Sequence, residues 1–416
     1  MRPLEKKPES STIPAWETSN DVHDEENVMR GSPRHHFALS RFFVLVLAIG
    51  IGFGPSTLTL SAQDDSQWFV QAEYDNQMRQ RTVEPQGPAD QPWVQMIEPQ
   101  MVDTSKYASG PGWHLCFSNA GVNNPWRAVG YTTMQAEVDL HPEITQFTHV
   151  DAEGNDNKQI SDIQDLLNQD CDALIVSPNT TAALTPVVEQ ACQRLPVIVF
   201  DRGVSTGCPT TFIHPIGGYV FGAVGAEFLV DKVPKDGNIL ALRILPGVDV
   251  LETRWAAADH IFTENGMNVV GVEFSQGDRA RVKSIVTDYI ERFGQIDGIW
   301  MDAGQDAVAA IEAFEDLGMD IPPIVGEDQQ DFLQKWSDDG LTAIAPSWPT
   351  FQWRTPVIAA TMILSGQPVP SEWVLPQPTI TQDNLAQYVQ TNMPPQHYAL
   401  CGCEKMPGYP QRWGGQ

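Results

Sequence analysis

Asp201 and Arg202 are the residues whose types and position first suggest chemistry. They directly follow an apolar run at residues 196–200, and a similar run at 173–176 also ends in polar residues. Between the two runs, residues 181–192 carry apolar side chains at helical spacing, which predicts a strand, a helix and a second, parallel strand. Ligands of open α/β sheets bind outside the carboxyl ends of the strands. An adjacent carboxylate and guanidinium at such an end offer a hydrogen-bond acceptor beside donors.

The overall composition excludes several classes of function. The 416 residues leave room for two α/β domains, and their net charge of −28 argues against nucleic acid, because phosphate contacts need Lys and Arg. No Walker loop, GxGxxG or GxSxG motif occurs, and the glycines at 217, 218, 222 and 225 are spaced for close helix packing rather than for phosphate. We therefore expect no nucleic-acid partner and no cofactor.

Residues 1–62 are interpreted as a leader that contains a signal peptide. Its apolar core, residues 42–54, follows Arg41 and is about thirteen residues long. A helix that spans a bilayer needs roughly 20 residues, so a secretory signal peptide fits better, although a membrane anchor stays open as the alternative. Residues 63–111 are rich in Gln and Pro and are interpreted as an extension or linker.

Export would place the cysteines in an oxidising compartment, which favours disulfides. Cys171 precedes one predicted strand, Cys192 ends the next helix, and Cys208 precedes a further strand. If these strands are parallel, all three lie near the amino-terminal edge of the sheet, and Cys192–Cys208 is a reasonable disulfide. Cys401 and Cys403 could bind a metal, but a disulfide or free thiols are favoured because no cluster of histidines accompanies them, so no metal site is expected.

The folded body is predicted to begin at Gly112 and to alternate strands with helices. Strand-like runs form two successive sets of similar length, at 113–117, 146–150, 173–176, 196–200 and 210–213, and then at 238–244, 268–274, 297–301, 324–326 and 341–345. Helix-like segments separate them. This alternation predicts an α/β fold with two doubly wound, Rossmann-like parallel-sheet lobes.

Five segments carry a resemblance to a known family. They are Asn124-Pro125-Trp126, the pair 172–179 and 196–202, Arg254 after ILPG, IVGED at 324–328, and AIAPS at 343–347. In order and spacing this set resembles the type I periplasmic sugar-binding proteins, the ribose-binding-like substrate-binding family of ABC transporters. The resemblance covers roughly two thirds of the chain, from Gly112 to about Leu385.

The resemblance implies two lobes joined by a three-crossing hinge that closes around a ligand in the cleft. Residues 112–213 and 348–368 would form the N-lobe, residues 216–346 and 372–395 the C-lobe, and residues 396–416 a C-terminal tail. By position match it also implies a ligand-binding set of residues. The set is Asn124, Trp126, Arg127, Asp201, Arg202, Arg254, Asp302, Asp328, Ser347 and Trp348.

Some of these positions depart from the family pattern. Arg127 stands where a second aromatic residue is usual in the family, and Trp348 could supply the missing ring. Asp302 lies one residue before the position where the family has an Asn-Asp pair. The residue types suit a sugar, because charged side chains can hold paired hydroxyls and aromatic rings can cover the apolar faces. The mixture of Arg and acidic residues favours a neutral or zwitterionic ligand over a strongly anionic one.

The resemblance implies the exported binding component of an ABC importer. Such a protein would bind a carbohydrate or a similar polar small molecule, act as a monomer in the periplasm or outside the cell, and deliver the ligand to a membrane permease. A sensor module that presents its ligand to a receptor or histidine kinase is the alternative. An enzyme that uses the acidic residues Asp201, Asp302, Glu327 and Asp328 is disfavoured, because no positioned nucleophile or metal cluster accompanies them.

Overall fold

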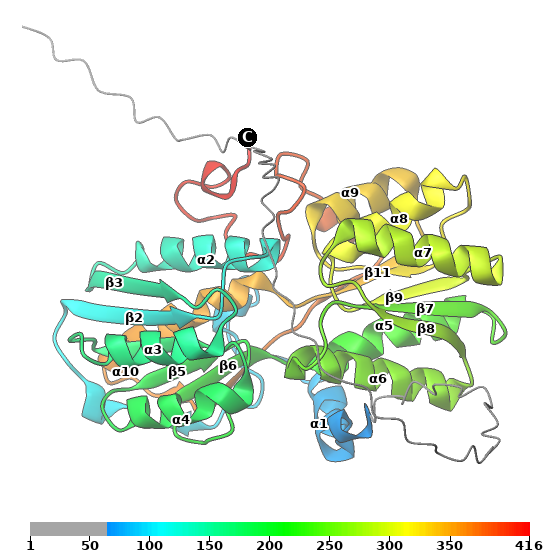
Figure 1. Cartoon of the computed structure of the whole chain (residues 1–416). Coiled ribbons are helices and arrows are strands. Elements are labelled where there is room, and N and C mark those ends of the chain that lie inside the picture. The colour runs from blue at the N-terminus through cyan, green and yellow to red at the C-terminus, as the bar shows by residue number, and fades with distance from the viewer. Residues whose placement is uncertain (1–64) are drawn as a thin grey trace, which may run out of the picture. The chain divides into compact units, whose positions relative to one another are not determined.

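Two six-stranded β-sheets form the framework of residues 65–416, the part of the chain that the computed structural model describes (Figure 1). The predicted leader, with its apolar core at 42–54, lies outside the described residues. The first sheet has the order β13-β6-β5-β4-β2-β3, with all strand pairs parallel. Its strands are β2 (Trp113–Asn119), β3 (Ile144–Asp151), β4 (Ala173–Ser177), β5 (Val197–Phe200), β6 (Thr211–Pro215) and β13 (Glu372–Leu375).

The second sheet has the order β14-β11-β10-β9-β7-β8 and is parallel except for its edge strand β14. Its strands are β7 (Asn238–Arg243), β8 (Asn268–Phe274), β9 (Gly298–Met301), β10 (Ile324–Val325), β11 (Ala343–Pro346) and β14 (Thr379–Ile380). The α/β fold with two parallel-sheet lobes is thus confirmed. We call the part built on the first sheet the N-lobe and the part built on the second the C-lobe.

Helices cover both faces of each sheet. In the N-lobe, α2 (Pro125–Val138) and α10 (Thr355–Leu364) pack on one face, and α3 (Asp156–Leu166) and α4 (Thr181–Cys192) on the other. In the C-lobe, α5 (Gly218–Lys232) packs on α6 (Asp249–Asn265), and α8 (Gln305–Asp316) packs against α7 (Arg279–Phe293) and α9 (Gln330–Asp339). Figure 1 shows these two groups on opposite sides of the second sheet. Because both faces are covered, strands such as β4 are buried at every position.

Strand β13 corrects one predicted boundary. The sequence prediction placed residues 372–395 in the C-lobe, but β13 pairs in parallel with β6 of the N-lobe. The edge of β6 offers unpaired backbone groups, and Trp373 on β13 is fully buried in the N-lobe core, where its Nε1 donates to the Gln95 carbonyl at 2.8 Å. The chain therefore crosses to the C-lobe after Leu375, before β14.

The segment before Gly112 contacts both lobes. Helix α1 (Gln71–Gln80) packs on α5, while β1 (Met101–Val102) pairs with β12 (Val369–Pro370) beside the N-lobe. Short 3-10 turns complete the described chain, at η1 (Asp65–Trp68), η2 (Pro92–Val94), η3 (Ser105–Tyr107), η4 (Thr350–Trp353), η5 (Leu385–Gln387) and η6 (Gln411–Trp413). Among residues 65–416, no helix has the length and apolar character needed to cross a bilayer.

Three disulfides join the described cysteines. Cys192 is bonded to Cys208, the pair that the sequence favoured, and links the end of α4 to the loop before β6. Cys116 on β2 is bonded to Cys171, which precedes β4. Cys401 is bonded to Cys403, and both are buried against α2 together with Trp413. The part of the predicted C-terminal tail from Cys401 onward is therefore packed onto the N-lobe.

Candidate ligand-binding site

A cavity of about 120 Å³ lies between the carboxyl ends of the two sheets. Seven of the ten predicted ligand-binding residues line it: Asn124, Trp126, Arg127, Asp201, Arg202, Arg254 and Trp348. The remaining lining residues are Ile244, Leu245, Val250, Leu251, Ala303, Glu327 and Tyr398. Residues from both lobes thus meet where the topology of parallel sheets predicts a ligand.

Asp201 is the centre of the N-lobe wall. Its Oδ2 accepts from Arg127 Nη2 at 3.0 Å, and its Oδ1 accepts from Trp348 Nε1 at 2.9 Å. Asp201 has a φ of 69°, in the left-handed region that non-glycine residues seldom adopt, and its side chain is buried. Its backbone turns sharply after β5 and aims the carboxylate at two donors that come from α2 and from the segment after β11.

The start of helix α2 positions Arg127. The side chain of Asn124 caps the helix by accepting from the Arg127 N–H at 2.9 Å, and Pro125 occupies the first helical turn. Arg127 Nη1 also donates to Asn119 Oδ1 and to Ser177 Oγ, each at 3.2 Å, so its guanidinium ties β2, β4 and β5 together. Burial, with the charge of Arg202, lowers the pKa of Arg127 to about 10.

Arg202 does not pair with its neighbour Asp201. Its Nη1 donates to the carbonyl of Asn179, after β4, and its buried Nε has no hydrogen-bond partner within the protein. The sequence predicted that Asp201 and Arg202 both contact the ligand; both line the cavity, and within the protein Asp201 pairs with Arg127. Arg202 lines the cavity and has donor capacity to spare.

Arg254 is the principal cation of the C-lobe wall. Helix α6 places it under the cavity, where Nη1 donates to the carbonyl of Asp302 and the guanidinium lies 3.8 Å from the Phe221 ring centre. The ring of Trp348 lies 5.0 Å from the same guanidinium. The Arg254 Nε is buried without a partner. Desolvation lowers the pKa of Arg254, and the nearby carboxyl of Glu327 opposes that shift.

Three predicted residues do not line the cavity. Asp302 Oδ1 accepts from the Ile244 N–H at 2.8 Å and Asp328 Oδ2 accepts from the Leu400 N–H at 2.7 Å, so both carboxyls lie in the protein interior. Ser347 donates its hydroxyl to the Pro378 carbonyl. In each case a neighbour lines the cavity instead, namely Ala303, Glu327 and Trp348.

The buried carboxyls of the C-lobe have raised pKa values. Burial raises the pKa of Asp302 to about 7, and burial together with the charge of Glu327 raises the pKa of Asp328 to about 8. Burial also raises the pKa of Glu327, although Arg254 and the Gly304 N–H oppose that shift. Asp328 is therefore mostly neutral at pH 7, which reduces the negative charge beneath the cavity.

Two tryptophans form the aromatic part of the wall. Trp126 Nε1 donates to the Trp348 carbonyl at 2.6 Å, and its ring packs edge-on against Trp353 with centres 5.5 Å apart. Trp348 reaches across to Asp201 and Arg254. The bond between the two residues links the segment after β11 to α2. Tyr398, in contrast, comes from the C-terminal segment, and no sequence signal marked it.

A second, larger cavity of about 730 Å³ shares Asn124, Arg127 and Arg202 with the first. Polar side chains from both lobes line it, including Asn179, Gln276, Arg279 and Gln396. The two cavities also share Ile244 and Leu245, so they are adjacent.

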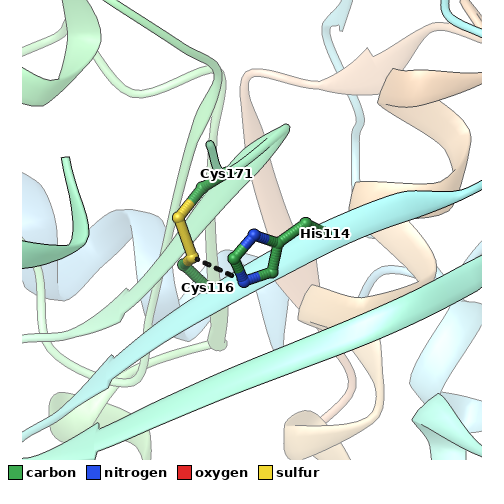
Figure 2. Close-up of side chains that lie close together, drawn as sticks. All are labelled: His114, Cys116 and Cys171. Carbon is green, nitrogen blue, oxygen red and sulfur yellow. Dashed lines mark hydrogen bonds between the residues drawn. A yellow bond between two sulfur atoms is a disulfide. The ribbon is translucent and has the colours of Figure 1, made fainter. Parts of the chain in front are cut away.

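Two His–Cys–Cys clusters in the described chain have the spacing of metal ligands, but their sulfurs are bonded to each other. Figure 2 shows His114 beside the Cys116–Cys171 disulfide, with Nε2 3.5 Å from Cys116 Sγ. His397 lies in the same way beside the disulfide of Cys401 and Cys403. A thiolate, not a disulfide sulfur, is the metal ligand, so these clusters are structural crosslinks in the oxidised protein.

The fold and the interlobe cavity define a bilobal ligand-binding protein. A family model described as the periplasmic binding protein domain matches residues 115–367, and the chain belongs to this family. The resemblance stated from the sequence is thereby confirmed.

Individual relatives are more distant. The ribose import binding protein of Bacillus subtilis is 27% identical over 221 residues, which cover 53% of this chain and 72% of that protein. A solved ABC transporter solute-binding protein from Thermobispora bispora superposes with a TM-score of 0.63 at 22% identity, covering 69% of this chain and 90% of that one. The fructose-binding periplasmic domain of a hybrid two-component system superposes with a TM-score of 0.59 at 21% identity, and the match covers 66% of this chain and 92% of that one.

Proposed function

We propose that this protein is the exported binding component of an ABC importer and that it binds a neutral sugar or polyol between its lobes. The observation that carries the proposal is the composition of the cavity wall. Donors with spare capacity (Arg202 and Arg254), an acceptor (Glu327) and two indole rings surround one small space. Paired donors and acceptors suit the hydroxyls of a sugar, and the rings suit its C–H faces.

The charge balance of the cavity supports a neutral ligand. Arg127 is already paired with Asp201, and Arg254 lies in the field of Glu327. A strongly anionic ligand would add charge next to Asp201 and Glu327, while a cation would lie beside Arg202 and Arg254. A ligand with hydroxyls and no net charge is repelled neither by the carboxylates nor by the guanidinium groups.

Isothermal titration calorimetry with the folded protein tests this proposal. The probes are D-ribose, D-xylose, L-arabinose, D-fructose, xylitol and myo-inositol, and ribose 5-phosphate is the matched anionic control for ribose. We expect at least one neutral probe to bind with a Kd in the micromolar range, about −8 kcal/mol. If none of the neutral probes binds at millimolar concentration, or if only the phosphate binds, the proposal is wrong.

Export, a monomeric state and delivery to a permease belong to the same proposal. The apolar run at residues 42–54 supports a cleaved signal peptide. N-terminal sequencing of the mature protein should find a start beyond residue 54, and an intact run would indicate a membrane anchor instead. Size-exclusion chromatography with light scattering should give a mass that fits one chain.

A sensor role is the second candidate, and the likeness to the fructose-binding domain of a two-component system supports it. The cleft would be used in the same way, with a different membrane partner. Crosslinking in the native membrane, followed by identification of the partner as a transporter subunit or a histidine kinase, distinguishes the two roles.

A further inference from the structure

The C-terminal segment forms a further connection between the lobes. Residues 397–403, which we call the C-terminal strap, start on the C-lobe, where Tyr398 pairs with Gln329 as an antiparallel bridge. The N–H of Gln330 donates to the His397 carbonyl, and the N–H of Ala399 donates to the Asp328 carbonyl, each at 2.8 Å. These bonds attach the first half of the strap to the segment between β10 and α9.

The second half of the strap is attached to the N-lobe. The N–H of Phe351 donates to the Leu400 carbonyl at 2.8 Å, and Arg354 donates to the Gly402 carbonyl. Arg354 is itself held by Glu137 of α2 at 2.6 Å. The Cys401–Cys403 disulfide closes a small loop at this end, and both of its cysteines are fully buried. The strap therefore crosses from one lobe to the other, and each half has its own anchors.

The crossing brings Tyr398 into the wall of the ligand cavity. Its side chain is 3% exposed and lines the 120 Å³ cavity with Glu327 and Arg254. The phenol donates to Glu327 Oε2 at 3.4 Å, which is long for an O–H···O bond, and the same oxygen accepts from the Gly304 N–H at 3.0 Å. Burial, followed by the charges of Glu327 and Asp328, raises the pKa of the Tyr398 phenol, so it keeps its proton.

We propose that Tyr398 is a specificity-determining ligand contact delivered by the strap, which lies beyond the matched domain at residues 115–367. The proposal rests on the proposed binding of a sugar or polyol. The phenol donates to one hydroxyl of the ligand while Glu327 accepts from the same or the adjacent hydroxyl. Because the bond between the phenol and Glu327 is long and weak, turning the hydroxyl toward a ligand sacrifices little.

This geometry has a consequence for selectivity. A donor and an acceptor side by side recognise a hydroxyl at one ring position, and a deoxy ligand would leave both groups unpaired in a desolvated site. The strap would thus distinguish ligands that differ at that position, while the rest of the wall binds features that all sugars share.

The test compares Tyr398→Phe with Tyr409→Phe, a control on the same C-terminal segment whose phenol contacts Gln390 outside the cavity. Both variants keep the ring and lose one hydroxyl. Calorimetry uses the best neutral probe from the panel above and its commercially available monodeoxy derivatives. We expect Y398F to weaken the best probe by about 3- to 10-fold, the loss of one hydrogen bond, and Y409F to change it by less than twofold. One deoxy derivative should bind Y398F and the native protein equally.

Several results would overturn the proposal. Native-like affinity of Y398F for the best probe would refute the contact while leaving the proposed function intact, and so would equal losses in both variants, which indicate a structural effect of the strap. If the native protein binds no neutral probe, the proposed function fails and this inference fails with it. Should Y398F not fold, a crystal structure of the native protein with the best probe decides. A phenol within about 3.2 Å of a ligand hydroxyl supports the contact, and a larger separation refutes it.

Discussion

The pairing of Asp201 with Arg127 makes a sharp prediction for the Asp201→Asn variant. Asp201 accepts from two donors, one on each carboxylate oxygen. Asparagine has the same shape but only one acceptor oxygen, so either Arg127 or Trp348 must face an NH₂ group. Asparagine also tolerates the left-handed backbone at this position, where φ is 69°, so the substitution adds little strain of its own.

The expected cost follows from burial. The side chains of Arg127 and Asp201 are only 4% and 5% exposed, so the variant leaves a guanidinium in the interior without its counter-charge. Removing one partner of a buried ion pair costs about 3–5 kcal/mol, because the remaining charge keeps its desolvation penalty. The remaining bonds of Arg127 to Asn119 and Ser177 are to neutral groups and do not replace the charge.

Urea unfolding followed by tryptophan fluorescence at pH 7 measures this loss. The matched control is Asp162→Asn, which breaks the partly exposed pair with Lys158 within α3 and should cost no more than about 0.5 kcal/mol. We also expect D201N to weaken binding of the best neutral probe, because Trp348 loses its anchor at the cavity. A loss of stability below about 1 kcal/mol would show that the Arg127 charge does not depend on Asp201.

Three further predictions concern charge, crosslinking and recognition. Burial, followed by the charge of Glu327, raises the pKa of Asp328 to about 8. The contribution of this residue to the free energy of unfolding is therefore fully present below the ordinary carboxyl pKa. That stability should be lost as the pH rises from about 4 through about 8, and Asp328→Asn should flatten the slope in pH-dependent urea titrations; an unchanged slope would contradict the raised pKa. Replacing Cys116 and Cys171 together by Ser opens a loop of 55 residues and should cost about 4 kcal/mol in urea unfolding, whereas a cost below about 1 kcal/mol would argue against that crosslink. Arg254→Lys keeps the charge but loses the planar group that lies on Phe221. Calorimetry should therefore show at least about tenfold weaker binding of the best neutral probe. Native affinity of this variant would show that Arg254 does not contact the ligand.

Local patterns in the sequence were sufficient to predict the α/β fold, and the resemblance to a known family predicted most of the cavity wall. Strand-like runs that end in polar residues identified Asp201, whereas Arg254 and Trp348 came from matching positions to the family that the sequence resembles. The fold and the strand ends depend on short-range properties, namely the apolar periodicity of each element and the position of its last residue, so they can be deduced from the order of the residues alone.

Tertiary structure decided which groups meet. Within the protein Asp201 pairs with Arg127, 74 positions away, and not with the adjacent Arg202. Glu327 lines the cavity, whereas the carboxyl of the next residue, Asp328, lies in the interior and accepts from the Leu400 N–H. Tyr398 enters the wall only because the strap is bonded to both lobes, and β13 joins the N-lobe because the edge of β6 is free to pair there. Such contacts join residues that are far apart in the chain, and no local pattern encodes them.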